Sequence, residues 1–331
     1  MTASDGALSP AREGASAQRV PDFFIVGHPK CGTTALYRML KRHPQVYMPE
    51  LKEPWFLAPE LRSRFTGPKL GMRPDTLEEY LLLFEAARRE QRAGEASSSY
   101  LMSRTAAGHI ADLQPAARIV AILREPASFL RSFHLQNLRV HIETESDLRK
   151  ALALEHERRE GRHIPRHSPR PPALMYSEHV QYVEQLRRYR ARFPAEQVLV
   201  LIYDDFRSDN EATVRRVLRF LEVDDSLPID VVEANPAKRV RSQRLHAAVQ
   251  AVSVGRGPVS EAVKASVKAF TSRRLRHAAL HGVRRRIVFA EPEPTDEQLM
   301  LELRRRCMPE VVALSEYLGR DLVTLWGYDR L

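Results

Sequence analysis

Gly27-His28-Pro29-Lys30-Cys31-Gly32-Thr33-Thr34 is the stretch of this 331-residue chain that decides its fold. It follows the apolar run Asp22–Gly27 (DFFIVG) and leads into Thr33–Leu40, where apolar residues repeat at helical spacing. That order predicts a buried strand, a tight loop and a helix. Because unpaired backbone N–H groups and the helix dipole bind anions at such a junction, the stretch predicts a phosphate site.

The position of the lysine separates this loop from ordinary nucleotide-binding loops. Both glycines of the pattern G-x-x-x-x-G-K-[ST] have a counterpart here, but Thr33 occupies the lysine position, and the lysine comes three residues earlier as Lys30. The displacement excludes an ordinary ATP or GTP loop. It places Lys30 beside the bound phosphate, where its ammonium can reach an oxygen that bridges the phosphate and a second group.

Two further apolar runs indicate a parallel sheet. Arg118–Leu123 (RIVAIL) and Gln197–Tyr203 (QVLVLIY) are apolar almost throughout, as in strands covered on both faces. Helices are predicted over Asp75–Arg92, Ala127–Leu138, Glu178–Arg192, Asn210–Leu221 and Asp296–Leu318. The alternation predicts an α/β fold, a single P-loop-type domain over residues 21–331 with a central parallel sheet flanked by helices. Residues 1–20 are predicted to be a disordered N-terminus.

Two segments interrupt this pattern. Residues 155–172 combine Pro, Arg and three His with no apolar period, which predicts a loop insert that is either a lid or a segment that contacts the substrate. Residues 236–286 carry thirteen Lys or Arg against one Glu, in a chain whose net charge is +10. Val259, Val263, Val267 and Phe270 repeat there at helical spacing, so we expect a basic helical arm. The arm either packs on its own domain as a gate, which we favour, or makes peripheral membrane contact through residues 259–286.

The cysteine count and the lack of long apolar segments narrow the class of protein. Cys31 and Cys307 are the two cysteines of the chain, too few for a disulfide framework or a Cys-based zinc site. No run approaches the roughly 18 apolar residues of a membrane span, and no secretory leader is recognisable. We therefore expect a cytoplasmic protein without a metal. The basic arm lacks interleaved aromatics, so no nucleic-acid partner is expected.

The phosphate loop belongs to a recognisable pair of motifs. HPKCGTTAL resembles the 5′-phosphosulfate loop, P-K-[SCA]-G-T-T, of sulfotransferases that use 3′-phosphoadenosine 5′-phosphosulfate (PAPS). Arg124-Glu125-Pro126, followed by Ser132, is similar to the 3′-phosphate element of that family, R-x-P…S. A guanidinium fork and a hydroxyl suit a second phosphate on the same nucleotide. The resemblance implies PAPS as the cofactor.

Smaller matches extend the resemblance over most of the chain. Residues 52–56 (KEPWF) and 94–100 (GEASSSY) resemble segments of glycosaminoglycan-type and bacterial sulfotransferases, and residues 203–205 (YDD) resemble the Y-E-D strand end of the family. Asn235, Arg239 and Arg241 are similar to its N-x-S-x-x-x-R region, and the final GRDLVTLWGY to its terminal signature. Ala96 and Ser98 depart from the family pattern at positions that concern the acceptor.

The resemblance also implies roles for individual residues. Lys30 neutralises the bridging oxygen of the leaving phosphate. Glu53 is the general base, with a pKa raised by nearby Trp55 and Phe56; Glu95 is the second choice and His28 a weaker one. The remaining cofactor-binding residues are Cys31, Gly32, Thr33 and Thr34 at the 5′-phosphate, Arg124 and Ser132 at the 3′-phosphate, Tyr203 at the adenine, and Arg239 and Arg241.

The function expected from this set is sulfuryl transfer from PAPS to a hydroxyl or amine of a glycan, lipid or specialised-metabolite acceptor. A P-loop kinase acting on a small molecule is an alternative, although no magnesium-binding Asp follows a second strand. A non-enzymatic protein that binds polyanions or nucleic acid through the basic arm is another.

Overall fold

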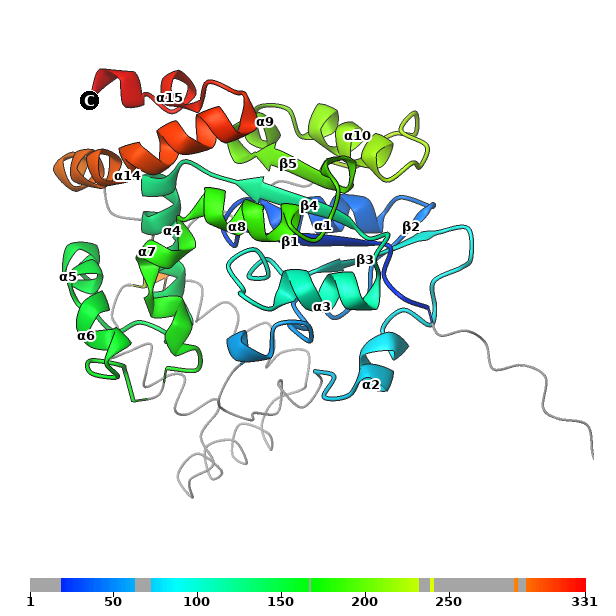
Figure 1. Cartoon of the computed structure of the whole chain (residues 1–331), viewed down its shortest axis with the longest axis horizontal. Helices are drawn as coiled ribbons and strands as arrows, with labels where there is room; N and C mark the ends of the chain where they lie inside the picture. The colour runs from blue at the N-terminus through cyan, green and yellow to red at the C-terminus, as the bar shows by residue number, and fades with distance from the viewer. Residues whose placement is uncertain (1–18, 63–72, 167, 232–238, 241–288, 291–295) are drawn as a thin grey trace, which may run out of the picture.

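The computed structural model describes residues 19–62, 73–166, 168–231, 239–240, 289–290 and 296–331 (Figure 1). At its centre lies a sheet in the order β2-β3-β1-β4-β5, in which every neighbouring pair is parallel. The strands are β1 (Phe23–Gly27), β2 (Val46–Tyr47), β3 (Arg92–Ala96), β4 (Arg118–Leu123) and β5 (Val198–Ile202). The predicted central parallel sheet is confirmed, and the loop at residues 27–34 follows its middle strand.

Two strands of the sheet were not predicted from the sequence. β2 is two residues long, and β3 reads RAGEA, without the β-branched residues that mark strands. Gly94 is needed in β3 because a Cβ there would lie 2.1 Å from the Phe23 ring of β1. Close packing between neighbouring strands, rather than intrinsic preference, therefore makes this segment a strand.

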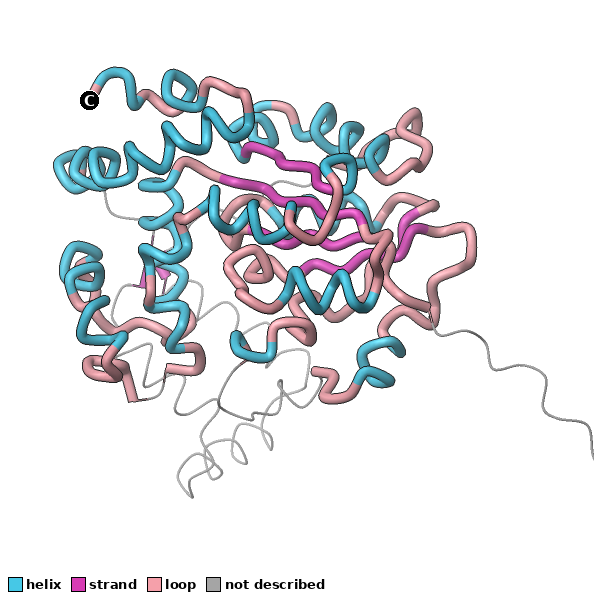
Figure 2. Tube along the Cα trace, viewed as in Figure 1, coloured by secondary structure: helices cyan, strands magenta, loops and turns pink. Residues whose placement is uncertain are grey.

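Helices cover both faces of the sheet (Figures 1 and 2). Helices α3 and α8 lie in front of it in the view of Figure 1, and α1 lies behind it. The longest helix, α14, packs against α4 and α8. The helices are α1 (Thr33–Lys41), α2 (Leu77–Leu82), α3 (Ala106–Leu113), α4 (Pro126–Arg139), α5 (Leu148–Ala153), α6 (Glu155–Arg159), α7 (Tyr176–His179), α8 (Tyr182–Arg190), α9 (Tyr203–Ser208), α10 (Asn210–Phe220), α14 (Glu297–Leu318) and α15 (Leu322–Leu325). Short 3₁₀ helices span Pro59–Leu61, Pro171–Leu174, Ala195–Gln197 and Tyr328–Arg330.

Three predicted elements differ from the structure. The helix expected over residues 75–92 is only α2, because the chain turns after Leu82 and enters β3 at Arg92. The helix expected over residues 178–192 is divided between α7 and α8. The strand expected over residues 197–203 is β5, which ends at Ile202, so Tyr203 begins α9 instead of ending the strand.

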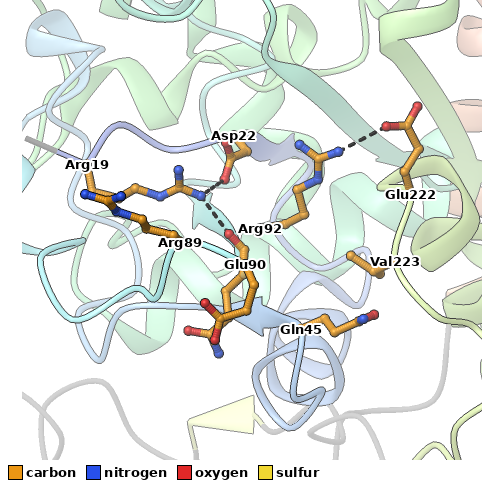
Figure 3. Close-up of a pocket in the computed structure, with 9 residues that line it drawn as sticks. Arg19, Asp22, Gln45, Arg89, Glu90, Arg92, Glu222 and Val223 are labelled. Carbon is orange, nitrogen blue, oxygen red and sulfur yellow. Dashed lines mark hydrogen bonds and ion pairs between the residues drawn. The ribbon is translucent and has the colours of Figure 1, made fainter. Parts of the chain in front are cut away.

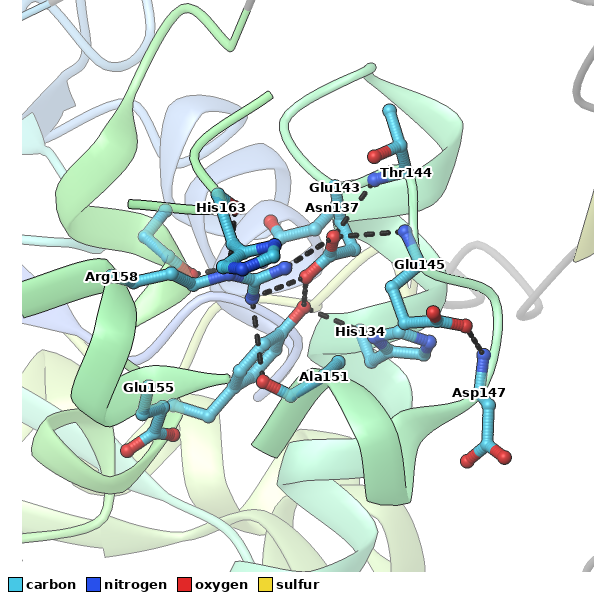
Figure 4. Close-up of polar contacts among 12 residues, drawn as sticks. His134, Asn137, Glu143, Thr144, Glu145, Asp147, Ala151, Glu155, Arg158 and His163 are labelled. Atoms are coloured by element: carbon cyan, nitrogen blue, oxygen red, sulfur yellow. Dashed lines mark hydrogen bonds and ion pairs between the residues drawn. The ribbon is translucent and has the colours of Figure 1, made fainter. Parts of the chain in front are cut away.

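The segment predicted as a loop insert, residues 155–172, begins as helix α6 and ends in a 3₁₀ helix. A buried ion pair holds it: Arg158 donates to both carboxylate oxygens of Glu143, at 2.7 and 2.9 Å (Figure 4). Tyr176 donates to the same carboxylate at 3.2 Å. The expectation of an irregular segment was wrong for α6 because polar contacts, which leave no apolar period in the sequence, hold the helix in place.

The two ends of the predicted domain are described in part. Residues 1–18 lie outside the described range, whereas Arg19 donates to Asp22 at 2.6 Å and Val20 packs against the core. Within the basic arm, Arg239–Val240 form strand β6, which pairs antiparallel with β7 (Phe289–Ala290) and lies against α4. The arm is therefore not helical at these two residues, because they are paired with a second strand. The rest of residues 236–286, including the stripe at 259–270, lies outside the described residues.

Candidate active site

The loop between β1 and α1 presents backbone N–H groups at the carboxyl edge of the sheet. Gly32 has a φ of 83° and immediately precedes α1, where a Cβ would lie 2.7 Å from the Phe206 ring. Among the described residues, no acceptor pairs with the backbone N–H groups of Lys30, Gly32, Thr33 and Thr34. The first turn of α1 carries no acidic side chain. An anion can therefore bind these N–H groups at the positive end of the helix dipole.

Lys30 and Arg124 lie side by side although they come from different strand ends. Arg124, which follows β4, donates from Nη1 to the carbonyl oxygen of Lys30 at 3.2 Å. Its guanidinium carbon lies 4.9 Å from the centroid of the Tyr203 ring, at the end of β5. Burial, with the positive charges of Arg139 and Arg124, lowers the pKa of Lys30 to about 8. The predicted motifs thus meet in one cationic site, which favours a ligand with several negative charges.

Two predicted cofactor residues, Cys31 and Ser132, are buried, and their roles stay predictions. Cys31 is fully buried, its backbone N–H donates to the carbonyl oxygen of His28 at 3.3 Å, and burial raises the pKa of its thiol to about 12. Cys31 therefore packs beneath the loop instead of offering a reactive group. Ser132 is buried on α4, and no hydrogen bond between described residues joins it to Arg124 or to the loop. Arg239 lies in β6, Arg241 lies outside the described residues, and the roles expected of both stay predictions.

Glu53 accepts hydrogen bonds from three neighbouring side chains. Lys52 Nζ and Ser98 Oγ donate to its Oε1 at 2.6 and 2.7 Å. Its Oε2 accepts from Trp55 Nε1 at 2.7 Å and from the Ser98 backbone N–H at 3.1 Å. Burial alone would raise the pKa of this carboxyl, but the Lys52 charge and these donors reverse the effect, so the pKa lies below its usual value. The expected raised pKa was wrong, because the sequence does not show the donors that Ser98 and Lys52 supply.

Glu95 has the raised pKa that was expected of Glu53. It lies inside β3 with no exposed surface, and its Oε2 accepts from Tyr80 and Tyr100 at 3.0 and 2.9 Å. Burial raises its pKa to about 7, an effect that the hydrogen bonds from Ser97, Tyr100 and Tyr80 offset only in part. The backbone N–H of Glu53 donates to Ala96 in the same strand at 3.1 Å. The two residues are therefore close in the fold, but their carboxyl groups differ in exposure and their pKa values shift in opposite directions.

His28, the weakest candidate base, belongs to the loop, and its side chain is buried in the protein interior. It is fully buried, and burial lowers the pKa of its imidazole to about 4. Its Nε2 forms a hydrogen bond of 2.6 Å with Gln185 Oε1 of α8. The ring also packs against Phe129, with centroids 5.2 Å apart. These contacts indicate that His28 fixes the loop to α8 and α4.

The C-terminal segment holds the residues next to Arg124 and Tyr203. Tyr328 donates to Glu125 Oε1 at 2.6 Å, and Trp326 Nε1 donates to Asp204 Oδ2 at 2.9 Å. Arg320 donates to both oxygens of Asp205, at 2.5 and 2.8 Å. Glu125 in turn caps α4 by accepting from two backbone N–H groups. We call these three contacts the C-terminal brace. One sign of the brace is visible in the sequence: the resemblance of GRDLVTLWGY to the family's terminal signature.

A separate cavity of about 240 Å³ lies at the opposite edge of the sheet (Figure 3). Its lining includes Arg19, Asp22 and Arg92, at the amino ends of β1 and β3, and Glu222, which pairs with Arg92 at 3.0 Å. Ligands of open parallel sheets bind outside the carboxyl ends of the strands. This cavity therefore lies on the wrong side of the sheet to belong to the candidate site.

Comparison with known proteins assigns the chain to a family. The Sulfotransferase family model matches residues 21–226, which include the loop, Glu53, Arg124 and Tyr203. The chain belongs to the Sulfotransferase family. The solved structure of a sulfotransferase from Alicyclobacillus acidocaldarius is similar with a TM-score of 0.64 and 27% identity, over 92% of this chain and 98% of that one.

Two relatives of the chain have names that refer to the sulfation of carbohydrates. Carbohydrate sulfotransferase 15 of Mus musculus is 33% identical over 35% of this chain and 27% of its own length. The bifunctional heparan sulfate N-deacetylase/N-sulfotransferase 2 of Bos taurus is 26% identical over 63% of this chain and 22% of its own length. The chain spans about a quarter of the length of these relatives.

The family implies a sulfate donor such as PAPS, and the loop fits one. Free backbone N–H groups at the start of α1, with the charges of Lys30 and Arg124, suit a ligand that carries two phosphates. Among the helices that the structure describes, none is long and apolar enough to cross a membrane.

Proposed function

We propose that this protein transfers the sulfuryl group of PAPS to a hydroxyl or amine of a glycan, lipid or small-molecule acceptor. The observation that carries the proposal is the contact of Arg124 with the Lys30 carbonyl, which joins two separate motifs into one cationic site. The carbohydrate relatives support a sugar hydroxyl as acceptor. The two free, buried cysteines support the proposal of a cytoplasmic location.

In this proposal, backbone N–H groups and positively charged side chains bind the sulfate donor, PAPS; we call these residues the donor side. The N–H groups of Gly32, Thr33 and Thr34 bind the 5′-phosphate, and Arg124 with Ser132 binds the 3′-phosphate. The Tyr203 ring contacts the adenine. Arg239 and Arg241 are included as cofactor-binding residues on the strength of the sequence resemblance alone. PAPS supplies a sulfuryl group on a phosphate leaving group, and every other step falls to side chains of this chain.

Lys30 and Glu53 perform the chemistry. Glu53 takes the proton from the acceptor's hydroxyl or amine while the oxygen or nitrogen of that acceptor group bonds to sulfur. At the same time, the bond between sulfur and the phosphate oxygen breaks, and Lys30 meets the negative charge that develops on that oxygen. The Glu53 carboxyl is ionised at neutral pH, as a base must be, although its lowered pKa makes it a weaker base than an ordinary carboxylate. Glu95 lies deeper, between two tyrosine hydroxyls, where an acceptor has less access.

Nucleotide binding tests this function against the kinase alternative. Isothermal titration of the purified protein should give a lower Kd for adenosine 3′,5′-bisphosphate than for adenosine 5′-phosphate, because Arg124 contacts the 3′-phosphate. We expect a difference of about tenfold or more from one charged hydrogen-bonded group. Tighter binding of ATP with magnesium than of the bisphosphate would overturn the proposal. Transfer of ³⁵S from labelled PAPS to a panel of glycosides then measures the activity directly.

A further inference from the structure

Two arginines lie over the same tryptophan ring beside Glu53. The guanidinium carbon of Arg73 is 3.9 Å from the centroid of the Trp55 ring, and that of Arg170 is 4.2 Å from it. Trp55 in turn donates to Glu53 at 2.7 Å. Arg73 precedes α2, and Arg170 precedes the 3₁₀ helix Pro171–Leu174, so segments far apart in the sequence supply the two charges.

Within the described part of the chain, the Glu53 carboxylate acts on both charges and raises the pKa of Arg73 and of Arg170 against the effect of burial. No carboxylate there forms an ion pair with Arg73 or Arg170, and the Glu53 carboxylate is already paired with Lys52 at 2.6 Å. His179, whose charge would interact with that of Arg170, is neutral, because burial lowers the pKa of its imidazole well below the usual value. Burial lowers the pKa of Arg170 to about 10, so it is still charged at neutral pH.

The contacts of the two arginines leave their hydrogen-bonding edges available. A guanidinium that stacks on a ring uses its face, and its N–H groups in the plane can still bind an oxyanion in a two-pronged manner. Both arginines are half-buried and neither forms an ion pair, and a negatively charged ligand would offset the cost of taking their charges partly out of water. Ring stacking alone explains the position of the arginines but leaves two positive charges without an ion pair next to the proposed base.

We propose that Arg73 and Arg170, held over Trp55, form a subsite for an oxyanion of the acceptor, a carboxylate or a sulfate ester. The inference rests on the proposed function and deepens it: the acceptor is already acidic before the transfer. Its negative group binds the arginines, and this contact places the acceptor hydroxyl near Glu53. Arg73 and Arg170 are specificity residues in this account, with no part in moving the proton.

Matched acceptors test the subsite. We would compare p-nitrophenyl β-D-glucoside with p-nitrophenyl β-D-glucuronide and with the 6-sulfated glucoside, each with labelled PAPS. The wild type should prefer at least one acidic acceptor in kcat/KM, and the better of the two acids identifies the oxyanion. Arg170→Gln and Arg73→Gln should each reduce this preference about 10- to 100-fold. Arg187→Gln is the control, because Arg187 is an exposed arginine over another ring, 5.9 Å from the centroid of Tyr317.

A binding measurement without donor separates this inference from the proposed function. The chain has two tryptophans, so Trp326→Phe leaves Trp55 as the single indole reporter. Glucuronate or sodium sulfate should change its fluorescence in a saturable way, and Arg170→Gln in the same background should weaken that binding about tenfold or more. Absence of a saturable change, or equal kcat/KM for the neutral and acidic glycosides, would overturn the subsite. Failure to bind adenosine 3′,5′-bisphosphate would instead contradict the proposed function.

Discussion

The donor side and the acceptor side of the site are built in different ways. On the donor side, the anion-binding groups belong to one short loop and to the residue that follows the neighbouring strand β4. On the acceptor side, Glu53, Trp55, Arg73, Ser98 and Arg170 come from four separate segments and meet only through side-chain contacts. The sheet itself therefore fixes the positions of the proposed donor-binding residues, whereas loops around the sheet fix those of the proposed acceptor-binding residues.

The largest expected effect tests which carboxylate serves the acceptor side. Glu53→Gln removes the basic oxygen while preserving the shape, so we expect turnover to fall about 10²- to 10⁴-fold. The Kd of adenosine 3′,5′-bisphosphate should not change, because the donor side is built from other residues. Glu95→Gln is the matched comparison and should leave turnover within a few fold. If the two variants exchange these effects, Glu95 is the base and the assignment of Glu53 is wrong.

The next effect tests the donor side. Lys30→Ala removes the charge that meets the developing negative charge on the leaving phosphate, and we expect kcat to fall about 10²- to 10³-fold. Single-turnover transfer with labelled PAPS measures this step. Lys41→Ala is the control, because Lys41 lies at the far end of α1, the helix that follows the loop, and is paired with Glu50 at 2.5 Å; this variant should keep near-normal turnover. A Lys30→Ala variant with near-normal turnover would remove the lysine from the mechanism.

The pH dependence of nucleotide binding tests the role of the Lys30 charge on the donor side. The pKa of Lys30 is lowered to about 8 in the free protein, so its positive charge is present below that pH and is lost as the pH rises. A bound phosphate favours the charged form, so above pH 8 binding takes up a proton. The Kd of adenosine 3′,5′-bisphosphate should then rise by up to about tenfold per pH unit. In Lys30→Arg the charge persists, and the profile measured by calorimetry between pH 7 and 9.5 should be flat.

The smallest expected effect concerns the C-terminal brace. Tyr328→Phe removes the hydrogen bond to Glu125, next to Arg124, and leaves a buried carboxylate with one donor fewer. We expect a loss of about 1 to 3 kcal/mol in the free energy of unfolding, measured with urea. The Kd of adenosine 3′,5′-bisphosphate should rise a few fold, while the Glu53-dependent step is unchanged. Tyr317→Phe on α14 is the control. If it raised the Kd of adenosine 3′,5′-bisphosphate as much as Tyr328→Phe does, the C-terminal brace would have no specific effect on the donor side.

Much of the donor side could be predicted from the sequence. Three of the five strands were expected, and the motifs at residues 27–34 and 124–132 pointed to adjacent strand ends. An apolar run followed by a glycine and a helical pattern is compatible with few structures other than a buried strand, a loop and a helix. Parallel strands also bring their carboxyl ends to one edge of the sheet. β3 was missed because its sequence RAGEA gains its strand geometry from packing on Phe23.

The acceptor side depended on tertiary contacts. The sequence placed Glu53 near aromatic residues and predicted a raised pKa, but Lys52, Trp55 and Ser98 stabilise the carboxylate and lower it. The raised pKa belongs instead to Glu95, which the sheet buries completely.

The central parallel sheet, the anion-binding loop and the family could thus be predicted from the amino-acid sequence, because these depend on local order along the chain. The direction in which each carboxyl pKa shifts, and the contact of Arg73 and Arg170 with Trp55, arise from tertiary contacts. A pKa depends on burial and on donors within a few ångströms, and residues far apart in the sequence supply both.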